Sequence, residues 1–133
     1  LVCACVTAKA ADEPRFNRDI RPLLAENCFA CHGPDDHARK GNLRLDTQDG
    51  AHKFAIVSGF PEKSSFFLRI SSSNGSLKMP PASSGKSLKP EQVALLKEWI
   101  RQGGKFDQHW AFKTPVRPAV PSIPLPSATP WTR

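Results

Sequence analysis

The sequence predicts an all-α fold of about three to four helices, in one small domain at residues 15–106. Several segments carry apolar residues at helical spacing, and no segment shows the strong alternation that is typical of a strand. The 133 residues suffice for one such domain and a tail. The tail at 113–133 holds six of the chain's 13 prolines, which favours extended polyproline structure over a packed core. We therefore expect 113–133 to be a linker to a missing downstream domain.

The first helix is expected before Cys28. Apolar residues recur on one helical face at Phe16, Ile20, Leu23 and Leu24. Proline is tolerated only in the first turn of a helix, so Pro22 suggests that the regular part begins near Asp19. Asn17 or Asp19 would cap this start. The helix then runs directly into Cys28.

The middle of the chain contains less regular patterns. Residues 42–47, NLRLDT, alternate in polarity and predict a short extended piece. Asp46 or Thr47 would cap a turn within 48–54.

Two further helices follow. One is expected from Pro61 at its first position, with a buried side made of Phe66, Phe67 and Ile70. Residues 71–87 are rich in Ser, Gly and Pro and predict a long flexible loop. The clearest helix begins at Pro90 and ends at Gly103. Its apolar face comprises Val93, Leu96, Trp99 and Ile100.

The first ten residues resemble the end of an export signal. They are apolar and small, and Ala8-Lys9-Ala10 forms an A-x-A cleavage site. We therefore expect 1–10 to be a signal-peptide remnant, and the mature protein to be exported to the periplasm or cell envelope. A lipid anchor at Cys5 is the alternative. No stretch reaches the ~20 apolar residues that a membrane span needs.

The motif C-x-x-C-H occurs at Cys28, Cys31 and His32. It is the sequence signature of c-type haem attachment. Two thiols add across the porphyrin vinyl groups, and the imidazole that follows can reach the iron from the proximal face. Haem attachment of this kind takes place outside the cytoplasm, in agreement with the export signal. We predict one covalent haem c, with its iron, per chain.

Three other sites use cysteines at this spacing. A structural zinc site needs four ligands, and the candidates are Cys28, Cys31, His32 and His37. Adjacent residues such as Cys31 and His32 can hardly both bind one tetrahedral ion. A redox dithiol of the thioredoxin type needs a preceding strand, whereas a helix is expected here. A local disulfide would close a tiny loop and remove little entropy from the unfolded chain.

A six-coordinate haem needs a second axial ligand, commonly Met or His. The only methionine in the sequence is Met79, in the segment LKMPP. A lone methionine is often a core filler, but such residues occur in periodic segments, and Met79 precedes two prolines in a loop. We therefore predict ligation by Met79. The fallbacks are His37, His52 and His109, all in polar or linker segments.

By these residues the chain resembles the planctomycete-type cytochrome c domain, a variant of the small mono-haem cytochromes c. The matching segments are FNRDIRPLLAENCFACHGPD, LRLDT, AIVSG, LRI, MPP, SLKPEQVALLKEWIRQGG and HWAF, over about 15–112. The resemblance implies a cytochrome c-like fold packed around the haem. It also implies haem attachment at Cys28 and Cys31, and axial ligation by His32 and Met79. Lys89 departs from the usual Thr or Ser helix cap, and Ser58 from a frequent Pro.

The expected function is one-electron transfer by a module of a larger exported protein. We expect no catalysis by this domain itself. The alternatives are a haem-based gas sensor with a labile Met79, and a structural zinc or disulfide module. The net charge of +7 comes from basic residues scattered among acids, which argues against nucleic-acid binding. Lys78 and Lys86 would form a basic face toward an acidic redox partner, or toward downstream domains of the same chain.

Overall fold

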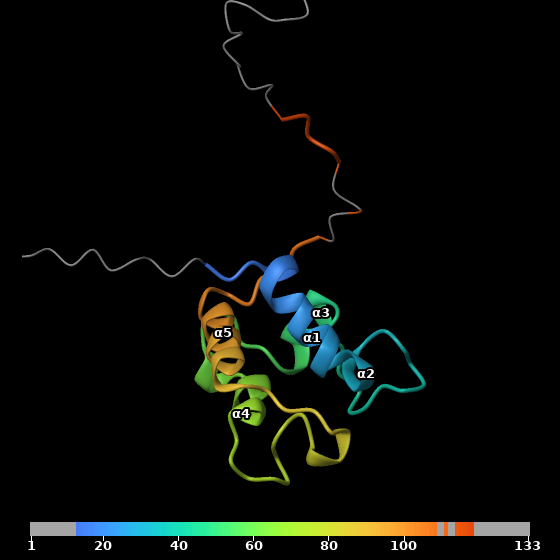
Figure 1. The fold of residues 1–133 in the computed structure, drawn as a ribbon, viewed down its shortest axis with the longest axis vertical. Coiled ribbons are helices and arrows are strands. Elements are labelled where there is room, and N and C mark those ends of the chain that lie inside the picture. Colours follow the sequence, from blue (N-terminus) through green and yellow to red (C-terminus); the bar gives the residue numbers. More distant parts are fainter. Residues whose placement is uncertain (1–12, 109–110, 112–113, 119–133) are drawn as a thin grey trace, which may run out of the picture.

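The computed structural model describes residues 13–108, 111 and 114–118, and within them it is all-α, as the sequence predicts. The α-helices are α1 (Arg21–Asn27), α2 (Phe29–His32), α3 (Gln48–Phe54), α4 (Ser65–Ile70) and α5 (Pro90–Arg101) (Figure 1). Three short helices of other types accompany them: the π-helix η1 (Phe16–Ile20) and the 3-10 helices η2 (Pro61–Lys63) and η3 (Ala82–Ser84). In Figure 1, α2 and α5 lie on opposite sides of α1.

A π-helix precedes the first α-helix. The π-helix η1 begins at Phe16 and continues directly into α1, whose regular part begins at Arg21, close to the expected start near Asp19. Pro22 still lies in the first turn of α1, as its missing N–H requires. Asp19 lies inside the helix and does not cap it in the usual way. Its carboxylate reaches back and accepts a hydrogen bond from the backbone N–H of Arg15 at 2.8 Å.

Residues 48–54 form the helix α3, where the sequence predicts only a turn. Of the two candidate caps, Thr47 takes the role, because its hydroxyl accepts from the N–H of Gly50 at 3.3 Å. His52 fixes the other end of α3 by donating from Nε2 to the carbonyl of Gly104 at 2.8 Å. Residues 42–47 form no strand. With α2, the described part therefore holds five α-helices in place of three to four.

The predicted helix from Pro61 is divided in two. Pro61 opens the 3-10 turn η2, and α4 begins only at Ser65. Ser64 lies between them and is fully buried. Phe66 is buried as expected, and so is Ile70, whereas Phe67 is half-buried.

Helix α5 agrees with the sequence prediction at both ends. Pro90 is its first residue, and the chain turns away at Gly103, whose φ of 106° favours glycine. In a capping box, the side chain before the helix and the side chain three residues later each accept a hydrogen bond from the other residue's N–H. The Lys89 side chain cannot accept, so the first of these two bonds is missing. The other half is present, because Gln92 Oε1 accepts from the N–H of Lys89 at 2.8 Å.

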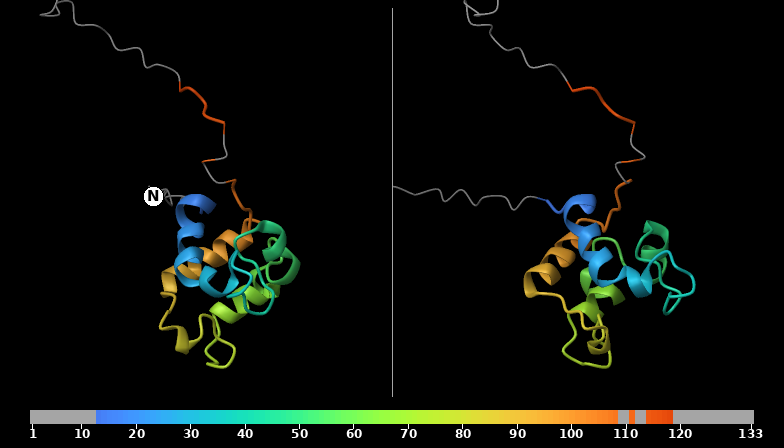
Figure 2. Two further views of the ribbon diagram at one scale, coloured as in Figure 1. Left: turned by 90° about the vertical axis from the view of Figure 1, so that its right-hand side faces the viewer. Right: turned by 45° about the vertical axis from the view of Figure 1, so that its right-hand side comes forward.

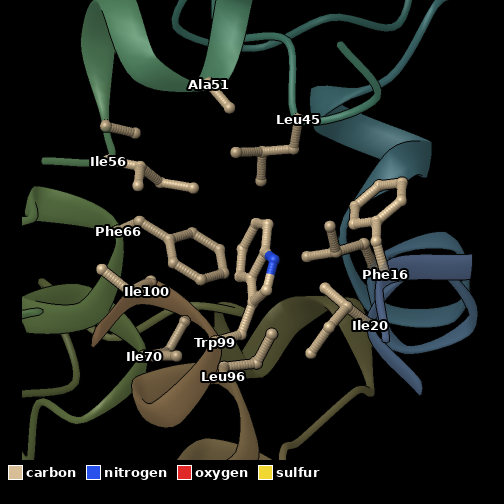
Figure 3. Close-up of a cluster of buried hydrophobic side chains, with 12 residues drawn as sticks. Phe16, Ile20, Leu45, Ala51, Ile56, Phe66, Ile70, Leu96, Trp99 and Ile100 are labelled. Atoms are coloured by element: carbon tan, nitrogen blue, oxygen red, sulfur yellow. The ribbon is translucent and has the colours of Figure 1, made fainter. Parts of the chain in front are cut away.

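The core surrounds Trp99, which lies at the centre of the labelled side chains in Figure 3. Its ring centroid is 5.9 Å from that of Phe16 and 5.3 Å from that of Phe106. The indole N–H donates to the carbonyl of Lys105 at 2.9 Å. The core therefore joins η1, α5 and the segment after α5.

The loop between α4 and α5 lies at the end of the domain opposite η1 and the segment after α5 (Figure 2). These two segments are joined by Asn17, whose Nδ2 donates to the carbonyl of Gln108 at 2.9 Å. The domain limits 15–106 remain a prediction. Residues 1–10, with Cys5, and most of the Pro-rich tail lie outside the described residues. Within the described ranges, no helix has the length and apolar character to cross a membrane.

Candidate functional site

Cys28, Cys31 and His32 lie at the junction of α1 and α2. Cys28 ends α1 with its N–H donating to the carbonyl of Leu24 at 2.8 Å, as expected for a cysteine at a helix end. Its own carbonyl accepts from the N–H groups of Cys31 and His32, at 3.1 and 2.8 Å. One helical turn therefore spans the motif. Cys28 packs partly buried against the core, while Cys31 is exposed.

The His32 ring is oriented by a backbone carbonyl. Its Nδ1 lies 3.1 Å from the carbonyl oxygen of Lys40. A carbonyl only accepts, so Nδ1 carries the proton and donates. Burial lowers the pKa of His32, against an opposing effect of the Lys40 hydrogen bond, and this favours the neutral ring. The neutral ring then has Nε2 unprotonated, which is the form that binds a metal.

The segment after His32 folds back onto the motif. The N–H of Lys40 donates to the carbonyl of Cys31 at 2.7 Å, and that of Leu45 to the carbonyl of His32 at 2.8 Å. Gly33 permits this close return. A Cβ at this position would lie 2.3 Å from the carbonyl oxygen of Phe29, so any side chain would displace the backbone.

Both cysteines of the motif are free thiols, so no local disulfide joins them. Burial raises the pKa of Cys28 to about 12, although the nearby charge of Lys86 opposes the shift. Redox-active dithiols depend on a lowered thiol pKa, so this environment disfavours the thioredoxin-like interpretation.

Met79 lies in the loop between α4 and α5, where the sequence places it. Its side chain is half-buried and packs against the core. Its N–H donates to the carbonyl of Arg69, in the last turn of α4, at 3.1 Å. Met79 is therefore attached to α4.

Two cations connect this loop region to the motif. The ammonium of Lys86 donates a hydrogen bond to the backbone carbonyl of Glu26, two residues before Cys28. The charge of Arg69 contributes to the lowered pKa of His32, so the guanidinium lies near that ring. Sequence analysis did not single out Arg69 or the carbonyls of Glu26 and Lys40. Backbone acceptors leave no residue-type signal that could have indicated them.

The fallback histidines differ in their surroundings. His52 uses its Nε2 to hold Gly104, as described above, which gives it a structural role. His37 is exposed. His109 lies outside the described residues. Across the described residues, no three His, Cys, Asp or Glu side chains are grouped so as to hold a metal ion. The four-ligand zinc site is therefore not assembled there.

The hollows of the described part include two that border the core. One, of about 650 Å³, lies at the end of the η1–α1 helix opposite Cys28 and is bordered by Phe16, Trp99 and Lys105. The other is a groove of about 370 Å³ between α4, α5 and the Met79 loop, bordered by Phe67, Lys78 and Leu88. Neither is lined by the C-x-x-C-H residues.

The donor set fits a c-type haem. Two free thiols lie one helical turn apart, and the adjacent imidazole has its Nδ1 hydrogen-bonded and its Nε2 available. Partly buried apolar side chains from four segments pack against the core, among them Cys28, Phe29, Leu43, Phe67, Met79 and Leu88. This combination of donors and apolar surface suits a flat, largely apolar ligand.

Comparison with known proteins agrees with this resemblance over part of the chain. A family model described as Planctomycete cytochrome C matches residues 28–83, a span that begins at Cys28 and includes His32 and Met79. Helix α5, η1 and the whole of α1 lie outside this match. No curated protein and no solved structure matches the chain. Domains of this family are typically exported. Residues 28–83 of the chain therefore match the planctomycete cytochrome C family, which supports a domain of that kind and suggests haem binding.

Proposed function

We propose that the domain binds one haem covalently through Cys28 and Cys31, with His32 as the proximal ligand. The observation that carries the proposal is the His32–Lys40 hydrogen bond, because it fixes the tautomer whose Nε2 can bind iron. The helical turn supports it, because it brings both cysteines and His32 into one turn of backbone.

We propose further that Met79 is the second axial ligand and that the domain transfers single electrons. The bound haem would supply a one-electron iron couple. Six-coordinate iron with two protein ligands suits electron transfer, since the ligands stay in place through the redox cycle. The hydrogen bond from Met79 to Arg69 and the packing of Met79 against the core support this role.

We propose that the domain acts outside the cytoplasm, in the periplasm or cell envelope, and passes electrons to a redox protein or to other domains of its own chain. It would not catalyse a reaction itself. Lys78 is the clearer of the two lysines expected to face an acidic partner, since Lys86 directs its ammonium to the carbonyl of Glu26.

Covalent attachment is tested by expressing the chain with and without haem maturation in a periplasm. We expect a c-type visible spectrum that persists after denaturation and extraction with an organic solvent. The Cys28→Ser, Cys31→Ser double variant should lose it. A chain that binds zinc and never acquires haem would support the structural zinc module instead.

Ligation by Met79 is tested with the variants Met79→Ala and Leu77→Ala. Leu77 is the matched control, because it lies in the same loop and is 50% exposed. Met79→Ala should keep the haem but lose the far-red sulfur–iron band of the ferric form and gain carbon monoxide binding. Leu77→Ala should change neither. If the wild type already binds carbon monoxide readily, the gas-sensor alternative is favoured.

A further inference from the structure

The loop that carries Met79 is tied to two different helices. On one side, the Met79 N–H is bonded to the carbonyl of Arg69 in α4. On the other side, Lys86 donates to the carbonyl of Glu26 in α1, across 60 residues of sequence. The first bond alone does not connect the loop to the helix that leads into the C-x-x-C-H motif. The second one does.

A tight turn presents Lys86 to α1. The Ser84 hydroxyl donates to the carbonyl of Pro81 at 2.7 Å and accepts from the N–H of Lys86 at 3.3 Å. Gly85 has a φ of 67°, a conformation that glycine adopts without strain. The backbone on the N-terminal side of Lys86 is therefore organised by local hydrogen bonds, and its side chain extends from a defined position.

The acceptor on α1 suits a cation. Glu26 is in the last turn of the helix, where carbonyl groups lack intrahelical partners and carry partial negative charge. A bond from an ammonium to such a carbonyl is charge-assisted and stronger than a neutral one. The ammonium also lies close enough to Cys28 to affect that thiol, since its charge opposes the rise in the pKa of Cys28.

We propose that Lys86 is a positioning residue that latches the Met79 loop to the end of α1 and so holds Met79 over the His32 site. This inference rests on the proposed His/Met ligation. When the latch is broken, the second half of the loop loses its hydrogen bond to α1, and Met79 leaves the iron more often. Lys86 thereby sets how much of the time Met79 occupies the sixth coordination position of the iron. A haem whose sixth position is always occupied carries electrons, whereas one whose sixth position is free can bind an external ligand.

The experiment compares Lys86→Leu, Lys86→Arg and Lys78→Leu in the haem-loaded protein. Leucine removes the donor and keeps part of the apolar stem, while arginine can still donate to a carbonyl. Lys78 is the matched control, because it is exposed and adjoins Met79, and its change to leucine removes the same charge. Within the described residues its side chain has no hydrogen bond or ion pair. Amide hydrogen exchange over 81–88 reports the latch itself. The far-red ferric band and carbon monoxide affinity of the ferrous form report Met79.

Lys86→Leu should speed exchange in 81–88 and raise carbon monoxide affinity, each about tenfold, which corresponds to ~1.4 kcal/mol. Lys86→Arg should restore both to within about threefold of the wild type, or ~0.7 kcal/mol. Lys78→Leu should leave both unchanged. If Lys86→Leu and Lys78→Leu show the same amide exchange over 81–88 while the wild type has the far-red ferric band, the latch is overturned and the ligation by Met79 stands. A wild type without the band contradicts the ligation, and with it the positioning role.

Discussion

The hydroxyl of Ser64 is the most informative single group for the stability of the helix that holds Met79. It is fully buried and lies between η2 and α4. It accepts from the N–H of Val57 at 2.9 Å and donates to the carbonyl of Phe60 at 2.9 Å. Since a hydroxyl has one proton, the longer contact to the carbonyl of Val57, at 3.3 Å, is secondary.

Ser64→Ala removes both bonds, so the N–H of Val57 loses its partner, while the carbonyl of Phe60 keeps only the bond from the N–H of Lys63 at 3.1 Å. A hydrogen bond contributes ~1 kcal/mol net, and an unsatisfied buried group costs ~1–3 kcal/mol. Val57 is 42% exposed, so water can compensate part of the loss at its N–H. We therefore expect a fall of about 2 kcal/mol in the free energy of unfolding. In a domain of this size that corresponds to ~8–16 °C in Tm.

The assay is urea and thermal unfolding of the haem-loaded protein, followed by far-ultraviolet circular dichroism. Ser65→Ala is the matched control, because Ser65 is exposed and its hydroxyl makes only a 3.3 Å contact with the carbonyl of Phe54. It should change stability by less than ~0.5 kcal/mol. The reasoning is refuted if both serine variants lose the same stability, or if Ser64→Ala is as stable as the wild type.

Three other predictions follow from the site and its surroundings. The Cys28→Ser, Cys31→Ser variant should be poorly ordered by circular dichroism, because a domain this small buries a modest core and the haem adds apolar contacts; a cooperative transition close to that of the holoprotein would contradict this. The Arg44 guanidinium holds the pKa of Asp46 below its usual 3.8, so the ionised carboxylate stabilises the folded state above about pH 4, and this contribution is lost as pH falls further. In unfolding measured between pH 2 and 5, the free energy of unfolding of Asp46→Asn should therefore fall less steeply with acid than that of the wild type. Electron transfer to an acidic acceptor should slow as salt rises, since steering between exposed charges is screened beyond ~8–10 Å; Lys78→Glu should weaken that dependence, and a salt-independent wild type would exclude steering.

Local sequence determines much of this domain. Cys28, Cys31 and His32 lie within one helical turn, so their spacing alone brings them together. The matching segments along the chain predict the family whose model the comparison finds. Helix α5 could also be predicted, since Pro90 and Gly103 act on the backbone within one turn of where they stand. The sequence missed α3 as a helix, because its seven residues carry weak periodicity and tertiary contacts hold its end at Gly104.

Only the tertiary structure decides what surrounds the motif. The ring of His32 is oriented by the carbonyl of Lys40, and Lys86 reaches the carbonyl of Glu26 from 60 residues away. Every residue has such a carbonyl, so residue type cannot show which one a distant side chain will find. The choice depends on how the helices pack around Trp99 and on where that packing leaves the loop after α4. The predicted haem-attachment motif therefore lies within five consecutive residues, while the contacts that position Met79 and Lys86 depend on the fold.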